Sequence, residues 1–247
     1  DRPASHDERD SLRALVQRAS NHEPVQYLLG EAGFLGRIFA VGPGVLIPRT
    51  ATETLIQHVV TWRGGQPEDQ RQESLRILDI GTGSGCIAIS LALQFPDAQV
   101  VAVDCSEDAI QYATRNVNSF GVQDQVHILS GDLCAPLAED AMFDVIVSNP
   151  PYIPDGQWAD VGINVRDFEP SIALRGGPDG RDVINRILEQ APSHLSEDGL
   201  LILEVDSTHA QEVCGNVDSH AMLSDARVLK DEYRDDRFVA ARGVTSG

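Results

Sequence analysis

The sequence lacks the features of a membrane-spanning or secreted protein. Its 247 residues contain no apolar run long enough to cross a bilayer, and the first residues show no signal-peptide pattern. The four cysteines are far apart and form no C-x-x-C pair, which suits a reducing compartment. We therefore expect a soluble, cytoplasmic protein. Because the first residue is Asp1 rather than Met, we also expect a fragment that lacks the natural N-terminus.

Basic residues and metal-ligand patterns are scarce as well. Acidic residues outnumber basic ones by 38 to 19, which gives a formal net charge of −19. Since affinity for nucleic acids comes largely from lysine and arginine on phosphates, this balance disfavours a DNA or RNA partner and favours a basic protein substrate. The same acidity would also serve solubility alone. The seven histidines show no metal-ligand spacing, so no metal site is predicted.

From residue 75 onward, predicted strands alternate with predicted helices, which is typical of a parallel sheet covered on both faces. Two further strands, expected at 226–230 and 238–242 around a charged turn, would form a hairpin at the sheet edge. The expected strands of the alternating region are 76–80, 99–104, 125–130, 143–147 and 200–205, and the expected helices are 84–94, 107–120 and 180–194.

The first part of the chain follows a different pattern. Leu12 and Val16 share one face of a helix predicted over 7–19, with Asp10 or Ser11 as its cap. A single helix has no partner for that face, so we expect the end of a helical subdomain whose beginning is missing. The elements expected next are a hairpin around Gly36 (34–41), a helix (52–62) and an exposed linker (63–73).

The sequence Ser-Asn-Pro-Pro-Tyr at 148–152 stops a short buried strand. Two prolines cannot continue a sheet ladder, so Asn149 is expected at the carboxyl end of the strand, where ligands bind in parallel sheets. Pro151 would fix the direction of the preceding carbonyl. The Asn149 amide oxygen, the Pro150 carbonyl and the Tyr152 ring would then receive a flat NH2 group. A turn that only ends the strand explains the motif equally well.

A glycine-rich loop follows the first strand of the alternating region. Its glycines permit positive φ and let backbone N–H groups and a helix N-terminus approach a ligand. A P-loop is excluded because Cys86 stands where its lysine would be, and the third glycine comes one position too early for a G-x-G-x-x-G motif. The remaining interpretation is a loop that binds S-adenosylmethionine, with Asp79 near the amino group of the cofactor. The loop residues are Gly81, Thr82, Gly83, Ser84 and Gly85.

Further acidic residues are expected at the ends of the next strands. Asp104 ends the second strand roughly twenty residues beyond the loop, where a carboxylate can accept both ribose hydroxyls. Asp132 follows the third strand and can accept from the adenine N6 amine, while Leu133 covers the ring. Each acid alone is typical of a cap or a turn. Three acids at successive strand ends, Asp79 included, predict a cofactor site that Asn149 borders.

With these motifs the chain resembles the HemK/PrmC protein-(glutamine-N5) methyltransferases, which modify peptide chain release factors. The Asn-Pro-Pro-Tyr motif is shared with adenine methyltransferases of DNA, but the Ile-Pro-Arg and Phe-Glu-Pro segments favour the narrower family. The resemblance covers at least residues 23–242. Its marks are 46–49 (Leu-Ile-Pro-Arg), 77–85 (the glycine loop), 149–153, 168–170 (Phe-Glu-Pro) with 173–174, and 176–180 (Gly-Gly-Pro-Asp-Gly).

The resemblance implies a class I S-adenosylmethionine-dependent methyltransferase of the α/β class. Its Rossmann-like sheet would have seven mostly parallel strands and a C-terminal antiparallel hairpin, preceded by a remnant helical segment and a β-hairpin. Three regions are implied: the end of a helical substrate-docking domain (1–30), a hairpin, helix and linker (31–73), and the methyltransferase domain (74–247).

The resemblance also implies roles in the site. The glycine loop and Asp104 would hold S-adenosylmethionine, which becomes S-adenosylhomocysteine, with Asp132 and Leu133 near the adenine. No metal, nucleic acid or membrane is expected to take part. The side-chain amide of the glutamine in a Gly-Gly-Gln motif of the release factor would be held by Asn149, Pro150, Pro151 and Tyr152, of which all but Pro151 would be catalytic.

The chain departs from the family pattern in places. Residues 50–53 are Thr-Ala-Thr-Glu where the family has Pro-Glu-Thr-Glu, so Thr52 and Glu53 remain but the first acid is missing. Asp206 replaces the glycine of a Glu-Ile-Gly segment, which puts a tight turn there in question. We expect most of the family's N-terminal helical domain to be missing from this sequence, which puts docking rather than chemistry in question. Arg49 would pair with an acid beneath the asparagine loop or lie free on the surface.

Three other functions stay open as alternatives. An adenine N6-methyltransferase would use the same NH2 receptor, but it needs a basic groove and a base-flipping element that this acidic chain does not show. A glutamine methyltransferase acting on a ribosomal protein would have the same chemistry with a different docking surface. Outside enzymes, the chain would be a cofactor-binding assembly partner, an interpretation that the intact Asn-Pro-Pro-Tyr motif opposes.

Overall fold

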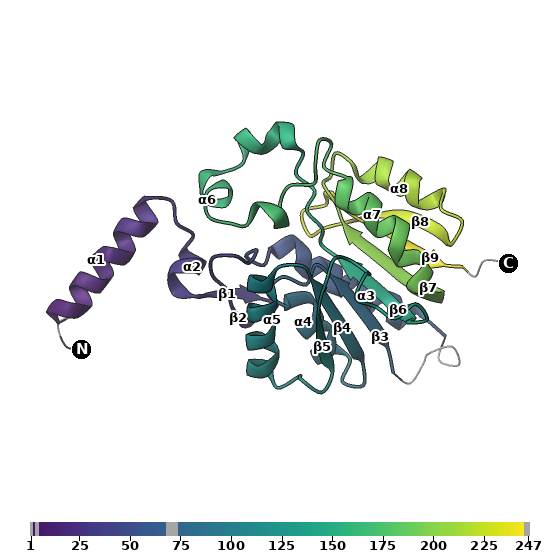
Figure 1. The fold of residues 1–247 in the computed structure, drawn as a ribbon, viewed down its shortest axis with the longest axis horizontal. Coiled ribbons are helices and arrows are strands. Elements are labelled where there is room, and N and C mark those ends of the chain that lie inside the picture. Colours follow the sequence, from purple (N-terminus) through teal and green to yellow (C-terminus); the bar gives the residue numbers. More distant parts are fainter. Residues whose placement is uncertain (1, 3–4, 68–73, 245–247) are drawn as a thin grey trace.

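A seven-stranded sheet forms the centre of the molecule, with the strand order β5-β4-β3-β6-β7-β9-β8 (Figure 1). The computed structural model describes residues 2, 5–67 and 74–244. Five neighbouring strands are parallel, and β9 and β8 are antiparallel to their neighbours, so the predicted hairpin at the sheet edge is confirmed. The strands are β3 (Arg76–Ile80), β4 (Gln99–Asp104), β5 (Val126–Ser130), β6 (Phe143–Ser148), β7 (Leu195–Glu204), β8 (Leu223–Lys230) and β9 (Asp236–Gly243).

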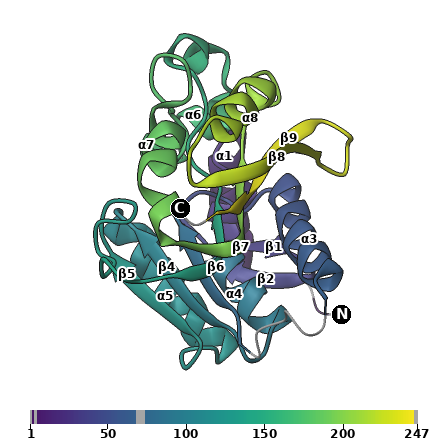
Figure 2. The ribbon, with the colours of Figure 1, turned by 90° about the vertical axis from the view of Figure 1, so that its right-hand side faces the viewer.

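Helices cover both faces of this sheet, as Figure 2 shows. The strands are apolar on both sides: in β6, Val145 and Val147 belong to the core on one face, whereas Ile146 belongs to the core on the other. The helices α3 (Thr50–Gly65), α4 (Cys86–Gln94) and α5 (Glu107–Phe120) pack on the first face, and α7 (Asp182–Gln190) and α8 (Ala210–Asp218) pack on the second.

The element boundaries agree with the sequence predictions for β3, β4 and α5 and differ elsewhere. The predicted helix at 180–194 is divided, because α7 ends at Gln190 and a 3₁₀ turn (Ala191–His194) with Pro192 in its first turn follows. Strand β7 begins five residues before the predicted position, and α8 was not predicted at all. Helix α3 is longer than the predicted 52–62 and takes up the first residues of the predicted linker, whose residues 68–73 lie outside the described part of the chain.

The N-terminal part consists of α1 (His6–Ser20), α2 (Val25–Leu29) and a hairpin of β1 (Glu31–Phe34) and β2 (Arg37–Ala40). The prediction that Asp10 or Ser11 caps the first helix is wrong. Ser5 is the cap, and it forms a capping box with Glu8. None of the described residues of α1 is buried, and the helix extends away from the rest of the molecule (Figure 1).

The hairpin is anchored to the main domain through Asn116 of α5. The backbone N–H of Ala40 donates to Asn116 Oδ1 at 2.8 Å, and Asn116 Nδ2 donates to the carbonyls of Ala40 and Ser84 at 3.0 and 2.8 Å. Phe39 adds a ring contact with Phe120 at 4.7 Å between centroids. A buried amide with all these partners fixes the segment that leads from the hairpin to the sheet edge.

The stretch between β6 and α7 contains only short helical pieces, in agreement with the irregular region expected there. They are a 3₁₀ turn (Asp155–Asp160), α6 (Ile163–Arg166) and a second 3₁₀ turn (Ser171–Ala173). The backbone of Ile153 bridges to that of Arg175 and closes this stretch into a loop. In the described part of the chain, no helix is both long and apolar enough to cross a membrane.

Candidate active site

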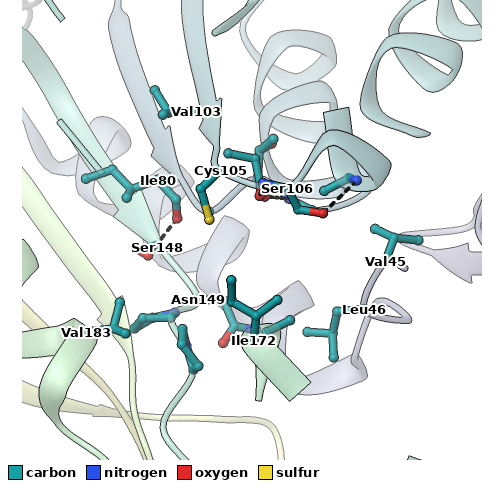
Figure 3. A pocket seen from close by; sticks show the side chains of 18 of the residues that line it. Val45, Leu46, Ile80, Val103, Cys105, Ser106, Ser148, Asn149, Ile172 and Val183 are labelled. Atoms are coloured by element: carbon teal, nitrogen blue, oxygen red, sulfur yellow. Dashed lines mark hydrogen bonds between the residues drawn. The ribbon is translucent and has the colours of Figure 1, made fainter. Parts of the chain in front are cut away.

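A cleft of about 220 Å³ lies at the carboxyl ends of the parallel strands (Figure 3). Its walls come from the loop after β3, the ends of β4, β5 and β6, the segment before α3, the 170–173 segment and α7. Most of the residues predicted for the site are brought together here. The cleft is lined by Gly81, Thr82, Gly83, Ser84, Asp104, Asp132, Leu133, Asn149, Pro150 and Pro151, but not by Asp79, Gly85 or Tyr152.

The glycine loop requires its glycines. Gly81, Gly83 and Gly85 have φ values of 73°, 58° and 80°, a region that side chains with a Cβ disfavour. A Cβ on Gly85 would also lie 3.2 Å from Ile89, so the start of α4 has no room for one. The backbone N–H groups of Gly81 and Thr82 donate to the Val103 carbonyl at 2.8 and 3.0 Å, which holds the loop against β4.

Asp79 lies beneath this loop rather than on the cleft wall. Its side chain is fully buried, and Oδ2 accepts from Thr82 Oγ1 at 2.6 Å and from the Ala88 N–H at 3.2 Å. Oδ1 is buried and accepts no hydrogen bond among the residues that the structure describes. Burial raises the pKa of Asp79 to about 7. Asp79 therefore joins the loop to α4 and keeps one unused acceptor.

The other two predicted acids lie on the cleft wall. Asp104 accepts the Gly83 N–H at 2.8 Å and the Ser106 N–H at 2.9 Å, one with each carboxylate oxygen, and its burial raises its pKa. Asp132 is more exposed and pairs with Arg186 of α7 at 2.5 Å. Asp104 therefore fixes the loop as well as facing the cleft, and each carboxylate oxygen keeps a second lone pair for a ligand.

The Asn-Pro-Pro-Tyr motif is anchored by hydrogen bonds of Asn149, its first residue, and of Ser148, which precedes it. Ser148 Oγ donates to the Ile80 carbonyl at 2.7 Å, a contact visible in Figure 3, and ties the end of β6 to the end of β3. Asn149 Nδ2 donates to Thr52 Oγ1 of α3 at 3.0 Å. Tyr152 directs its hydroxyl away from the cleft, to Glu204 Oε1 at 3.3 Å. In this structure the Asn149 side chain lines the cleft, whereas the Tyr152 hydroxyl does not.

Thr52 and Glu204 belong to the site but were not among the predicted site residues. Thr52 Oγ1 donates to Glu204 Oε2 at 2.7 Å, and the two side chains are 2% and 1% exposed. Burial raises the pKa of Glu204. A possible signal was the acid that ends the apolar strand 200–204, because a carboxylate in such a position needs hydrogen-bond donors.

The segment before α3 is fixed by Glu169. The Glu169 side chain accepts from Arg49 Nη2 at 2.6 Å and from the Ile47 N–H at 3.0 Å. Tyr27 Oη donates to the Val45 carbonyl at 2.6 Å. Of the two alternatives predicted for Arg49, pairing with an acid is the one observed, and the acid belongs to the Phe-Glu-Pro segment. These contacts link the Leu-Ile-Pro-Arg segment to the Phe-Glu-Pro segment across one side of the cleft.

Glu53, which the chain shares with the family pattern, and Asp206, which departs from it, both support turns. Glu53 Oε1 accepts the N–H of Leu35, which has a φ of 48°, at 2.6 Å, so Glu53 supports the hairpin turn rather than the cleft. Asp206 closes its turn with its side chain, since Oδ1 accepts from the N–H and the hydroxyl of Thr208 at 2.8 and 2.5 Å. Among the described residues, no group of three or more His, Cys, Asp or Glu side chains is placed to hold a metal ion.

Two family models match the chain. The methyltransferase small domain matches residues 50–164, and the PrmC N-terminal domain matches residues 1–30. A solved structure of the Thermus thermophilus 16S rRNA N2 G1207 methyltransferase in complex with AdoMet and guanosine has a TM-score of 0.59, is 22% identical, and covers 87% of this chain and 50% of its own. This likeness confirms the predicted fold class.

Curated relatives are similar over most of the chain. A release factor glutamine methyltransferase of Chlorobaculum tepidum is 39% identical over 240 residues, which cover 96% of this chain and 80% of the relative. One of Geobacter sulfurreducens is 40% identical, with 98% and 81% covered. A ribosomal protein uL3 glutamine methyltransferase of Bordetella pertussis is 43% identical, with 78% and 63% covered.

Proposed function

This chain belongs to the release factor glutamine methyltransferase family, and we propose that it methylates the side-chain amide nitrogen (N5) of the glutamine in the Gly-Gly-Gln motif of a peptide chain release factor. The methyl donor is S-adenosylmethionine. The observation that carries the proposal is the position of Asn149: its amide lines the cleft beside the glycine loop, and its NH2 end is already held by Thr52. The oxygen end is then left to accept an N–H from a substrate amide.

The residues of the cleft fit S-adenosylmethionine. The loop glycines let backbone approach the ligand, and Asp104 offers a carboxylate at the position where ribose hydroxyls are bound in doubly wound sheets. Asp132 and Leu133 line the same cleft, and we propose that they contact the adenine edge and ring. The unused Oδ1 of Asp79 is an acceptor that an ammonium group would satisfy, directly or through a water molecule.

The task of the protein is to make a poor nucleophile react. An amide nitrogen is weak because its lone pair is delocalised into the carbonyl. When bound, S-adenosylmethionine supplies a methyl group attached to a positively charged sulfur. Asn149 Oδ1 and the Pro150 carbonyl would each accept one N–H of the glutamine amide, which raises the electron density on nitrogen and aims it at the methyl group. Each hydrogen bond would contribute about 2–4 kcal/mol in the transition state.

No strong base is required for the proton. A new N–C bond forms while the bond between carbon and sulfur breaks, and the nitrogen of the product is then acidic enough to release its proton to solvent. Pro151 keeps the Pro150 carbonyl in a fixed direction. Tyr152 does not line the cleft, and we propose that it supports the motif from behind, where the hydrogen bond from its hydroxyl to Glu204 holds the ring in place.

Other aspects of the proposal follow from the same site and the charge. We propose that a release factor, and no nucleic acid or membrane, is the partner, because the net charge of −19 repels polyanions. The cytoplasm is the compartment where release factors work. The division into a docking segment (1–30), a hairpin, helix and linker (31–73) and a catalytic domain (74–247) is kept as a prediction. Methylation of a ribosomal protein is the second candidate.

A transfer assay with radiolabelled S-adenosylmethionine tests the proposal. The acceptors are a release factor, its Gly-Gly-Gln to Gly-Gly-Ala variant, a ribosomal protein fraction and DNA. Label on the unaltered release factor alone is expected. Label on a ribosomal protein alone would favour the second candidate, and label on DNA would contradict the argument from charge.

A further inference from the structure

Asn149, Thr52 and Glu204, from separate parts of the fold, are connected by a chain of hydrogen bonds at the wall of the cleft. Asn149 at the end of β6 donates to Thr52 of α3, and Thr52 donates to Glu204 at the end of β7. The distances are 3.0 and 2.7 Å, and Thr52 and Glu204 are almost completely buried. Asn149 and Thr52 both line the cleft, whereas Glu204 does not. Because the Thr52 hydroxyl already contacts both Asn149 and Glu204, it acts on a ligand through the Asn149 amide.

The order of donors in this chain fixes the orientation of the asparagine. The Thr52 hydroxyl has a single hydrogen, which goes to the Glu204 carboxylate, because an ionised carboxylate can only accept. The lone pairs of the hydroxyl therefore face Asn149, and only the NH2 end of the amide can donate to them. The Asn149 oxygen is left on the opposite end of the amide, available to the cleft.

Thr52 is the third residue of α3, so the residue four positions earlier lies before the helix begins. Thr61, further along the same helix, donates to the Gln57 carbonyl at 2.8 Å, a contact that threonines within helices often make. Thr52 instead donates out of the helix to a residue 152 positions away. Its hydroxyl therefore serves the contact between α3 and the two strand ends, rather than the helix itself.

We infer that Thr52 and Glu204 are positioning residues, which hold the Asn149 oxygen toward the cleft so that the site selects a side-chain amide over a carboxylate of the same shape. An amide donates N–H to that oxygen, whereas a carboxylate presents only lone pairs and is repelled. If the amide of Asn149 turned over, its NH2 would face the cleft and the preference would be reduced or reversed. This inference rests on the proposed function.

The test compares variants of Thr52 in the full chain. Thr52→Val removes the hydroxyl and keeps the shape, Thr52→Ala removes it with less volume, and Thr52→Ser retains it. Thr54→Val is the matched control, because Thr54 is also buried in α3, at 8% exposure, and takes no part in the hydrogen bonds between Asn149, Thr52 and Glu204. The measurements are kcat and KM for a release factor, the affinity for S-adenosylmethionine, and competition by a release factor whose motif is Gly-Gly-Glu.

Thr52→Val and Thr52→Ala are expected to lower kcat/KM by on the order of tenfold and to strengthen competition by the Gly-Gly-Glu factor by a similar ratio. Thr52→Ser and Thr54→Val should keep the preference of the unaltered protein, and the cofactor affinity should be unchanged in all four. A structural role alone would lower activity without moving the preference for amide over carboxylate.

The outcomes separate this inference from the proposed function. If Thr52→Val and Thr52→Ala methylate the release factor and still reject the Gly-Gly-Glu competitor as strongly as the unaltered protein, the inference is wrong and the proposed function stands. If the unaltered protein binds S-adenosylmethionine but leaves the release factor unmethylated, the proposed function fails first, and the inference fails with it.

Discussion

Asn149 and Thr52 are 97 residues apart in the sequence, yet the amide of one donates to the hydroxyl of the other at 3.0 Å. This contact joins the motif that follows β6 to α3, the helix that precedes β3 and the glycine-rich loop. It also explains why an asparagine at a strand end can serve as a receptor: one end of its amide is occupied by the protein, and the other is left for a substrate.

The pH dependence of methyl transfer should reveal Glu204. The chain of hydrogen bonds requires an ionised Glu204, whose pKa is raised by burial. Activity is therefore expected to fall as pH decreases through this raised pKa, because Glu204 then gains a proton. Glu204→Gln, whose side chain does not titrate, should not show that acidic limb. The groups that face Glu204 are Thr52 and Arg49 of the α3 end, Tyr152, Arg237 of β9 and the thiol of Cys86.

The measurement for Glu204 is the rate at saturating S-adenosylmethionine over a range of pH, for both proteins. An identical acidic limb in Glu204→Gln would show that another group titrates, and that the ionisation of Glu204 is not required for activity.

Asp79 should make the cofactor-free protein less stable as pH rises. Its pKa in the folded protein is about 7, above the ordinary value of 3.8, so the folded state binds its proton more tightly than the unfolded state. The stability from this group is complete below the unfolded pKa and is lost as pH rises through about 7, by up to about 4 kcal/mol. Asp79→Asn should remove this dependence.

Urea unfolding at pH 5 and pH 8, without cofactor, compares the two proteins. The prediction for Asp79 fails if the variant loses as much stability between these pH values as the unaltered protein does.

Asp104→Ala should weaken binding of S-adenosylmethionine. The variant loses a charged acceptor on the cleft wall and the contact that fixes the Gly83 N–H at 2.8 Å. The expected loss is about 1–3 kcal/mol of binding free energy, measured by calorimetry. Asp124→Ala, an exposed acid in the turn before β5, is the control with the same change of charge. A dissociation constant that is unchanged in Asp104→Ala would limit Asp104 to a structural role.

The pair of Arg49 and Glu169 should contribute to stability. Glu169 is buried, and its carboxylate relies on Arg49 at 2.6 Å and on the Ile47 N–H. Because the Arg49 side chain is 34% exposed, solvent screens part of the interaction, and Arg49→Ala is expected to cost about 1–3 kcal/mol. Arg13→Ala, which breaks an exposed pair with Asp10, should cost about 0.5 kcal/mol or less. Equal losses in urea unfolding would show that the buried pair has no special role.

The cleft could be predicted from the sequence because its main parts are short motifs of consecutive residues. Strand β6 ends where two prolines follow, and the loop after β3 is marked by its glycines, so both could be placed at one sheet edge. Helix α8 was missed because few apolar residues mark its buried face, namely Ala210, Val213 and Val217.

The supporting contacts could not be predicted in the same way. Thr52 and Glu204 are 152 residues apart, and Arg49 and Glu169 are 120 apart. No periodicity connects such positions, and a lone threonine or acid has many ordinary roles in a helix or at a strand end. Only the folded sheet brings the start of α3 into contact with the ends of both β6 and β7.

The central claim is that Asn149 receives the amide of the substrate. Asn149→Ala removes the acceptor but leaves the glycine loop and Asp104 in place. The direct test is the rate of methyl transfer to a release factor, together with the affinity for S-adenosylmethionine. The account predicts a rate lower by on the order of a hundredfold or more with a nearly unchanged dissociation constant. A rate comparable with that of the unaltered protein would contradict it.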